Sequence, residues 1–249
     1  MAKGTLAGKH ILVTGGGRNI GRAVAEAAAK AGAKVAILEK DAGGAREALA
    51  GLKRLKAEAV EIVADLRDPA AVGRAFKAAE KALGRLDGLV NNAGVYVRGD
   101  FLEATEDHWD LTLDVNLKGP FLATQAFGRL AKARGGGGAV VNIVSVHASV
   151  GDPSVVPHCA SKAGLLGLTR ASAEALRPFG VRVNAVSPGA VGTWQGPYDA
   201  PPPAKPLQSM LVPSQVADAV LWLLSDAAAG ITGSELVVGG GTAFTLRMP

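Results

Sequence analysis

Residues 11–24 read ILVTGGGRNIGRAV, which is the pattern of a strand, a glycine turn and a helix in immediate succession. Such a turn presents backbone N–H groups and the positive end of a helix dipole, and both suit a pyrophosphate. The spacing is Gly15-x-x-x-Asn19-x-Gly21, so asparagine stands where the dinucleotide fingerprint has glycine. Because asparagine tolerates the left-handed backbone region, we expect the turn to survive. A turn that only needs glycine at positive φ is the alternative.

The rest of the chain repeats this alternation of short β-branched runs and longer Ala/Leu-rich stretches. The short runs are continuously apolar, which favours strands buried on both faces, as in a parallel sheet. The pattern predicts an α/β fold: one domain over 1–249, a doubly wound parallel sheet of about seven strands with helices on both faces. The expected strands lie within 10–15, 34–39, 59–66, 86–94, 139–146, 181–188 and 234–240, and clear helical patterns cover 19–33 and 69–84.

Composition limits the function classes. With 249 residues, 48% of them hydrophobic and 20% charged, the chain has the composition of a globular protein. No apolar run approaches the ~20 residues of a membrane span, so we expect no membrane partner. The single cysteine, Cys159, excludes a disulfide framework, and with an N-terminus unlike a leader it favours the cytoplasm. The net charge of +5 comes from interleaved acids and bases, which indicates mild attraction for anionic ligands and no nucleic-acid partner.

Acidic residues after the second and third expected strands bear on cofactor choice. Glu39 lies 24 residues after Gly15, where a carboxylate can accept hydrogen bonds from a ribose 2′-hydroxyl and repel a 2′-phosphate. This favours NAD, although Arg18 and Lys40 lie close in sequence and could favour NADP. Asp65 could accept a hydrogen bond from an adenine amine or cap the next helix through a local turn.

The proline-rich segment 193–210 has no periodicity and is long for a loop within a compact domain. Such a loop is usually a lid or a binding loop, so we expect it to shape the substrate pocket. Its Trp194 and Tyr198 suggest an apolar or ring-containing ligand.

Several further motifs occur in a fixed order with the glycine turn and Glu39. They are TGGGRNIG (14–21), DLRD (65–68), NNAG (91–94), DVNLKG (114–119), VNIVSV (141–146), HCASK (158–162) and VNAVSPGAV (183–191). Over essentially its full length the chain resembles the short-chain dehydrogenase/reductase family, and its 3-oxoacyl-ACP-reductase-like members in particular. The resemblance implies a single Rossmann-like domain, a nicotinamide cofactor, a small alcohol or ketone substrate and a homotetramer.

The resemblance also implies site residues. Asn116 would hold a helix bend and a water of a proton relay, Ser145 would hydrogen-bond the substrate oxygen, and Lys162 would grip the nicotinamide ribose. The implied cofactor-binding residues are Gly15, Arg18, Asn19, Ile20, Gly21, Glu39, Asp65, Leu66, Asn92, Ala93, Gly94, Lys162, Pro188, Gly189, Val191 and Thr193.

One position departs from the family pattern. The family has tyrosine four residues before the lysine, and here that residue is His158, 13 residues after Ser145. Imidazole is a competent acid/base at neutral pH, but it is shorter than phenol by about 2 Å, so a water would bridge it to substrate. One helical turn away, the Lys162 ammonium should lower the pKa of His158. A neutral base suits alcohol oxidation, whereas ketone reduction needs a proton donor.

His147 lies two residues after Ser145, on the same face if the strand continues. It could contact substrate together with Trp194, assist His158, or simply end the strand. The spacing of His147, His158 and Cys159 matches no zinc pattern, so we predict no metal site.

Three functions remain open. The first is an NAD-dependent oxidoreductase that interconverts a secondary alcohol and a ketone, with His158 as the acid/base. The second is a cofactor-binding homologue with little redox activity, serving as a sensor or partner subunit. The third is an isomerase or lyase of the same fold that uses His158 as a base.

Overall fold

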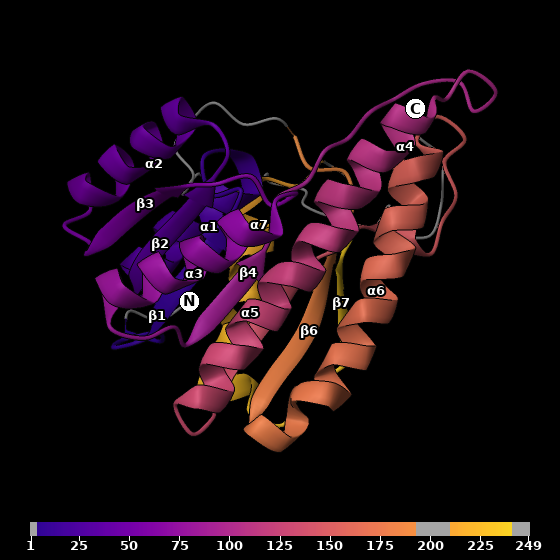
Figure 1. Ribbon diagram of the computed structural model, residues 1–249. Coiled ribbons are helices and arrows are strands. Elements are labelled where there is room, and N and C mark those ends of the chain that lie inside the picture. Colours follow the sequence, from indigo (N-terminus) through magenta and orange to yellow (C-terminus); the bar gives the residue numbers. More distant parts are fainter. Residues whose placement is uncertain (1–3, 193–209, 241–249) are drawn as a thin grey trace.

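The computed structural model describes residues 4–192 and 210–240, which form a parallel sheet of seven strands in the order β3-β2-β1-β4-β5-β6-β7 (Figure 1). Each of the seven expected runs corresponds to one strand, with bounds that differ by a few residues, so the doubly wound fold is confirmed. The strands are β1 (His10–Thr14), β2 (Lys34–Glu39), β3 (Ala59–Val63), β4 (Gly88–Asn91), β5 (Gly138–Ile143), β6 (Val181–Pro188) and β7 (Glu235–Val238).

Helices cover both faces of the sheet, as the continuous apolar strands require. On β1, Ile11 and Val13 pack into one buried cluster with α1 and α7, whereas Leu12 between them packs into another with α3 and α5. Figure 1 shows α3, α5 and α6 in front of the sheet. The helices are α1 (Asn19–Lys30), α2 (Ala42–Arg54), α3 (Pro69–Leu83), α4 (Glu106–Leu113), α5 (Gly119–Ala133), α6 (Val156–Leu176) and α7 (Pro213–Leu224).

Local sequence signals fix where several helices begin. Asp41 caps α2 by accepting hydrogen bonds from two backbone N–H groups, and Asp68 caps α3, which has proline at its first turn. Thr105 caps α4 in the same way. In contrast, Arg18 makes no side-chain capping bond at the start of α1.

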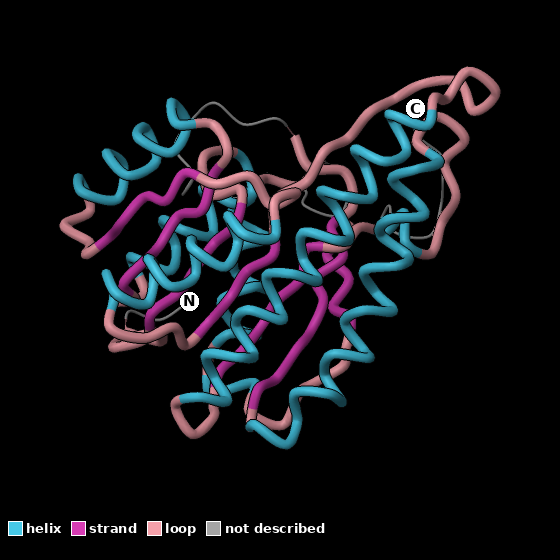
Figure 2. The backbone as a smooth tube through the Cα atoms, viewed as in Figure 1, coloured by secondary structure: helices cyan, strands magenta, loops and turns pink. Residues whose placement is uncertain are grey.

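A bend interrupts the long helix that crosses the front of the molecule. One π-helical turn, Asp114–Lys118, joins α4 to α5, and the three segments form a nearly continuous helix (Figure 2). Single π-turns within α-helices are rare and frequently lie at functional sites. Asn116, for which the resemblance implies a helix bend, lies within this π-turn.

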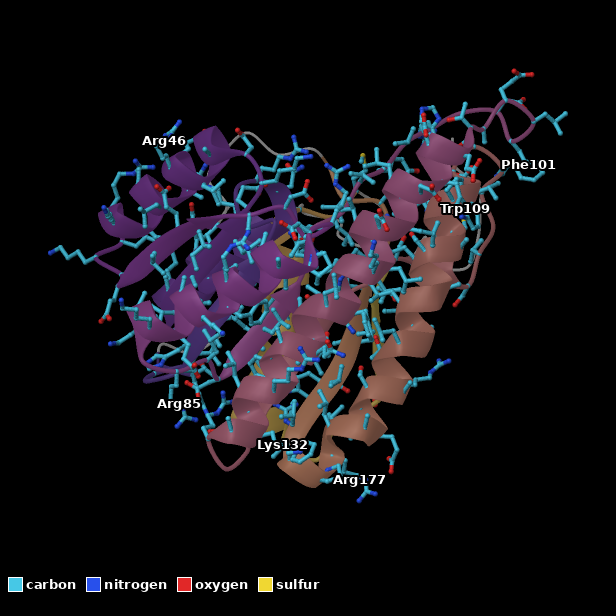
Figure 3. All side chains as sticks on the ribbon, viewed as in Figure 1. Arg46, Arg85, Phe101, Trp109, Lys132 and Arg177 are labelled. Carbon is cyan, nitrogen blue, oxygen red and sulfur yellow. The ribbon has the colours of Figure 1, made fainter. Side chains whose placement is uncertain are left out.

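The carboxyl ends of the strands form the edge where a site is expected. The order of the sheet reverses between β1 and β4, and in open α/β sheets ligands bind at such a switch point. The segment between β4 and α4 projects beyond the sheet at this edge (Figure 2). In Figure 3, Phe101, in that segment, and Trp109 lie at the upper right, and Arg46 on α2 lies at the upper left. Among the described residues, no helix combines the length and apolar character needed to cross a bilayer.

Candidate active site

The glycine turn between β1 and α1 has the backbone shape that the sequence predicts. Gly15 and Asn19 have positive φ angles of 62° and 46°, so asparagine does take the left-handed conformation there. Arg18, the residue before α1, makes no side-chain hydrogen bond to the backbone N–H groups at the N-terminus of this helix. This helix end is therefore suited to an anion.

Gly21 lies in the first turn of α1, where the backbone packs against the end of β4. A Cβ atom at this position would lie 2.1 Å from the Gly15 carbonyl oxygen and 2.4 Å from Asn92 Nδ2. Only glycine fits without displacement of the turn. The close neighbours of Gly21 are atoms of the protein itself, so the structure gives this glycine a packing role within the turn.

Asn92 connects the glycine turn to the end of β4. Its Nδ2 atom donates to the carbonyl oxygens of Thr14, at 3.0 Å, and Gly15, at 2.9 Å. Thr14 Oγ1 in turn accepts from the backbone N–H groups of Asn92 and Ala93. These four hydrogen bonds fix the switch point of the sheet. Gly94, two residues after Asn92, is exposed.

Glu39, at the end of β2, faces the glycine turn. Its Oε2 atom accepts a hydrogen bond of 3.1 Å from the Gly17 backbone, and its Oε1 atom accepts one of 2.8 Å from the Lys40 backbone. The carboxylate is thus held where the turn and the second strand meet. Arg18, which the sequence brings near it, is exposed.

Asp65 is an ion-pair residue and does not cap α3. Its carboxylate pairs with Arg67 at 2.7 Å and with Lys40 at 3.3 Å, and hydrogen bonds from Arg67 hold its pKa well below the ordinary range. The capping alternative is wrong because Asp68, three residues later, occupies the capping position. The pairing also places a carboxylate beside Lys40, one of the two cations considered for a 2′-phosphate.

Two apolar residues of the implied cofactor site lie at different depths. Ile20 is half-buried in the first turn of α1, and Leu66 is 5% exposed and packs in the core.

At the far side of the edge, β6 ends at Pro188, and the Gly189 N–H donates to the Val238 carbonyl at 2.9 Å. Val191 forms a parallel bridge with Leu211. Thr193, Trp194, Tyr198 and all but the last residue of the 193–210 loop lie outside the described residues.

Asn116, in the π-turn, is fully buried and links α4–α5 to two other segments. Its side chain accepts from the Val95 N–H at 2.8 Å and donates to the Val95 carbonyl at 3.0 Å. The same Nδ2 atom lies 3.2 Å from Ser161 Oγ and 3.5 Å from His158 Nδ1. The π-turn therefore positions an amide against the histidine of α6.

His158 and Lys162 share the buried face of α6, as their one-turn spacing predicts. Lys162 Nζ donates to the Ile143 carbonyl at 2.8 Å, and burial lowers its pKa to about 8. Burial and, second, the Lys162 charge lower the pKa of His158 to about 4. The imidazole is therefore neutral at physiological pH.

Tyr96 contacts His158 from the projecting segment between β4 and α4. Its ring meets the imidazole edge-on, with centroids 4.8 Å apart, and Arg98 Nη2 donates to its hydroxyl at 3.3 Å. The sequence reasoning missed Tyr96. The signal that could have found it is an aromatic side chain directly after the NNAG motif, in a chain with two tyrosines.

Ser145 and His147 lie in a short turn, not in a strand. β5 ends at Ile143, and Ser145 Oγ accepts from the His147 N–H at 3.2 Å at the start of a 3₁₀-helix, Val146–Ala148. The premise that the strand continues is wrong. The turn nevertheless brings the His147 ring to 5.8 Å from the His158 ring, and its Nε2 atom to 3.9 Å from Asp152 Oδ2. Asp152 was also missed.

The side chains around His158 do not resemble a metal centre. Within residues 4–192 and 210–240, no group of three or more His, Cys, Asp and Glu side chains could hold an ion. Cys159 Sγ lies 3.9 Å from the Asp152 carbonyl oxygen.

Comparisons with known proteins place the chain among dehydrogenases. A family model described as enoyl-(acyl carrier protein) reductase matches residues 15–243. The chain is 40% identical to D-threitol dehydrogenase of Mycolicibacterium smegmatis, with 97% of this chain and 95% of the relative covered. It is 39% identical to 2-(S)-hydroxypropyl-CoM dehydrogenase 3 of Xanthobacter autotrophicus, with 93% and 95% covered.

A solved structure has the same fold. The crystal structure of a short-chain type dehydrogenase/reductase from Mycobacterium marinum superposes with a TM-score of 0.89 and 31% identity, over 96% of this chain and 97% of that one. Architecture and sequence thus agree on one family.

Proposed function

Since the chain belongs to the short-chain dehydrogenase/reductase family of oxidoreductases, we propose that it interconverts a secondary alcohol and a ketone with NAD(H), using His158 as the acid/base group. The names of the two relatives, a hydroxypropyl-CoM dehydrogenase and a threitol dehydrogenase, support an alcohol substrate. The observation that carries the proposal is the neutral, buried imidazole of His158 between Asn116 and Lys162 at the carboxyl edge of the sheet.

The residues at this edge fit a nicotinamide dinucleotide. The uncapped N-terminus of α1 and the glycine turn suit the pyrophosphate, and Glu39 lies beside that turn, where the adenine-side ribose would bind. Lys162 would hold the nicotinamide ribose, and Pro188 and Gly189 would border the ring. When bound, the cofactor supplies the acceptor or donor of hydride.

Glu39 favours NAD over NADP. Its carboxylate is fixed by backbone hydrogen bonds on both oxygens, so it would meet a 2′-phosphate as a close like charge. Lys40, which could offset that repulsion, is paired with Asp65.

His158 has the protonation state that alcohol oxidation requires. A ring N–H of His158 donates to the Val95 backbone, so in the neutral imidazole the other ring nitrogen is unprotonated and can accept the hydroxyl proton, directly or through one water. Ser145, which accepts from the His147 backbone, keeps its hydroxyl proton for the substrate oxygen. Reduction would need protonated His158, which with a pKa of about 4 is about one molecule in a thousand at pH 7.

Turnover assays test this function directly. The purified protein should reduce NAD⁺ with at least one member of a panel of secondary alcohols and diols. His158→Ala should lower kcat by about 10²-fold or more while calorimetry shows NAD⁺ binding unchanged, because acid/base groups contribute about 10²–10⁴-fold. Cys159→Ala, at the neighbouring position, is the matched control and should keep turnover. Unchanged turnover in His158→Ala would refute the role of His158.

The absent family tyrosine favours a second candidate. A cofactor-binding homologue without redox turnover, or an isomerase or lyase with His158 as base, would keep the same nucleotide site. Such a protein would bind NAD⁺ and show no steady change of nicotinamide absorbance with any alcohol or ketone.

A further inference from the structure

His158 is poorly placed to keep the proton that it accepts. Its ring is 8% exposed, and Lys162 lies one turn away on the same buried face. Among the described residues, no carboxylate lies within ion-pair distance of its ring, so the imidazolium would be a buried cation beside another cation. Fast turnover therefore needs a second group that takes the proton on.

His147 has the partner that His158 lacks. Its Nε2 atom lies 3.9 Å from Asp152 Oδ2, and the two side chains are only 18% and 16% exposed. Ser154 fixes the other carboxylate oxygen, since Asp152 Oδ1 accepts from the Ser154 N–H at 2.9 Å and from its hydroxyl at 2.7 Å. The carboxylate is thus held with Oδ2 toward the imidazole.

The other nitrogen of His147 is buried without a hydrogen-bond partner among the described residues. Buried polar atoms are nearly always satisfied, so an unpaired nitrogen beside a site marks a place for a water or a substrate hydroxyl. The ring centroids of His147 and His158 are 5.8 Å apart and nearly perpendicular, a separation that one water can bridge.

Tyr96 holds the two imidazoles in this arrangement. Its ring lies nearly parallel to His147, with an interplanar angle of 16° and centroids 6.4 Å apart, and edge-on to His158. The Arg98 guanidinium lies over the tyrosine ring, 5.5 Å from its centroid, and its charge also acts on Asp152.

We propose that His147, oriented by Asp152, is the second station of a proton relay that takes the substrate proton from His158. This rests on the proposed function. In oxidation the alcohol C–H bond gives its hydride to the nicotinamide, and the O–H proton goes to His158. A bridging water then carries it to Nδ1 of His147, whose positive charge Asp152 balances before release to solvent. Reduction runs the same transfers backward, so the relay also supplies the proton that neutral His158 lacks.

The test uses His147→Gln and Asp152→Asn, with exposed residues of α4, His108→Gln and Asp110→Asn, as matched controls. Kinetics at saturating alcohol and NAD⁺ are measured across pH. His147→Gln should lower kcat by about 10-fold or more, and imidazole added to the buffer should restore part of it. Asp152→Asn should also lower kcat, and combining it with His147→Gln should lower kcat little further, because the carboxylate acts through His147.

The outcomes separate the relay from the function on which it rests. A wild-type protein that is inert on every alcohol and ketone would overturn both proposals. If the wild type turns over and His158→Ala does not, yet both relay variants keep the wild-type rate and pH profile, the relay alone is wrong. A loss of kcat in His147→Gln without imidazole rescue, together with a loss in Asp152→Asn that adds fully to it in the double variant, would assign the two residues a structural role and also overturn the relay.

Discussion

The carboxylate of Glu39 accepts a hydrogen bond of 3.1 Å from the backbone N–H of Gly17, so the acid at the end of β2 is fixed against the turn at the end of β1. A Cβ atom on Gly17 would lie 2.8 Å from the same carboxylate oxygen. The contact makes Glu39 part of the rim of the proposed nucleotide site, and the first prediction follows from it.

NAD⁺ should bind more tightly than NADP⁺, and Glu39→Ala should narrow the difference, because the variant removes the like charge that a 2′-phosphate would meet. Calorimetry with both cofactors measures this. Glu58→Ala, an exposed acid paired with Lys34, is the control and should leave the ratio unchanged. Equal or tighter NADP⁺ binding by the wild type would contradict the prediction and indicate that Arg18 binds the 2′-phosphate.

Gly21→Val should abolish cofactor binding. The nearest atoms to the new Cβ are the Gly15 carbonyl oxygen at 2.1 Å and Asn92 Nδ2 at 2.4 Å, so the turn itself must move. Calorimetry should show NAD⁺ affinity reduced beyond detection while circular dichroism keeps the α/β spectrum. The control is Gly73→Ala in α3, where a Cβ meets nothing within 4 Å and helix propensity predicts a gain of up to about 1 kcal/mol. Retained binding in Gly21→Val would place the phosphate site elsewhere.

The fold was predictable because its signals are local. Each strand is an apolar run, and turn or capping residues bound the helices, so order and topology follow from the pattern along the chain. The approximate positions of Gly15, Asn19 and Glu39 followed for the same reason. Asp65 shows the limit of this approach, since two acids precede α3 and only the geometry decides that Asp68 is the cap.

The surroundings of His158 were not predictable in the same way. Tyr96 and Asp152 come from irregular segments, and no periodicity relates them to α6. We expected His147 to share a strand face with Ser145. The strand ends at Ile143, four residues before His147, and a turn brings His147 to the site instead. Contacts made by loops depend on how the loops pack, which a local pattern does not encode.

His158 should make the protein less stable in acid. Its pKa of about 4 in the folded state lies below the ordinary 6.5, so the unfolded chain binds the proton more readily. Stability should therefore fall as pH decreases from 6.5 toward 4, by as much as about 3 kcal/mol. His158→Gln should flatten this dependence in urea unfolding across that range, and exposed His108→Gln should not. If the free energy of unfolding fell equally with pH in wild type and His158→Gln, the lowered pKa of His158 would be contradicted.

The protein should be a homotetramer, as its family resemblance implies. An apolar groove on α4, α5 and α6 is lined by Leu113, Leu117, Phe121 and Leu168, and Phe121 is 45% exposed. Light scattering should give about four times the monomer mass, and Phe121→Glu should reduce it, because a charge would be buried in the contact. Leu55→Glu, at an exposed apolar residue after α2, is the control. A monomer at micromolar concentration would refute this prediction.

The sharpest test of the acid/base assignment is His158→Tyr. With imidazole as the base, wild-type oxidation should already be near its maximum at neutral pH, because a base with a pKa of about 4 needs no alkaline activation. The tyrosine variant should show an added limb at higher pH, because a phenol must ionise to act as a base, and Lys162 should hold that limb below the usual phenol pKa. Initial rates across pH, with NAD⁺ and one turned-over alcohol, measure both profiles.

The comparison also decides between the two candidate functions. Tyr96 packs edge-on against the imidazole, so the larger phenol of His158→Tyr could clash with the Tyr96 ring. Combining His158→Tyr with Tyr96→Ala controls for this clash. If the wild type is inert while either tyrosine variant turns over alcohols, the natural protein is a nucleotide-binding relative whose chemistry was lost or changed at this position. If the wild type is active and His158→Tyr gains an alkaline limb that the wild type lacks, the group at position 158 is the working base, since only that side chain differs between the two proteins.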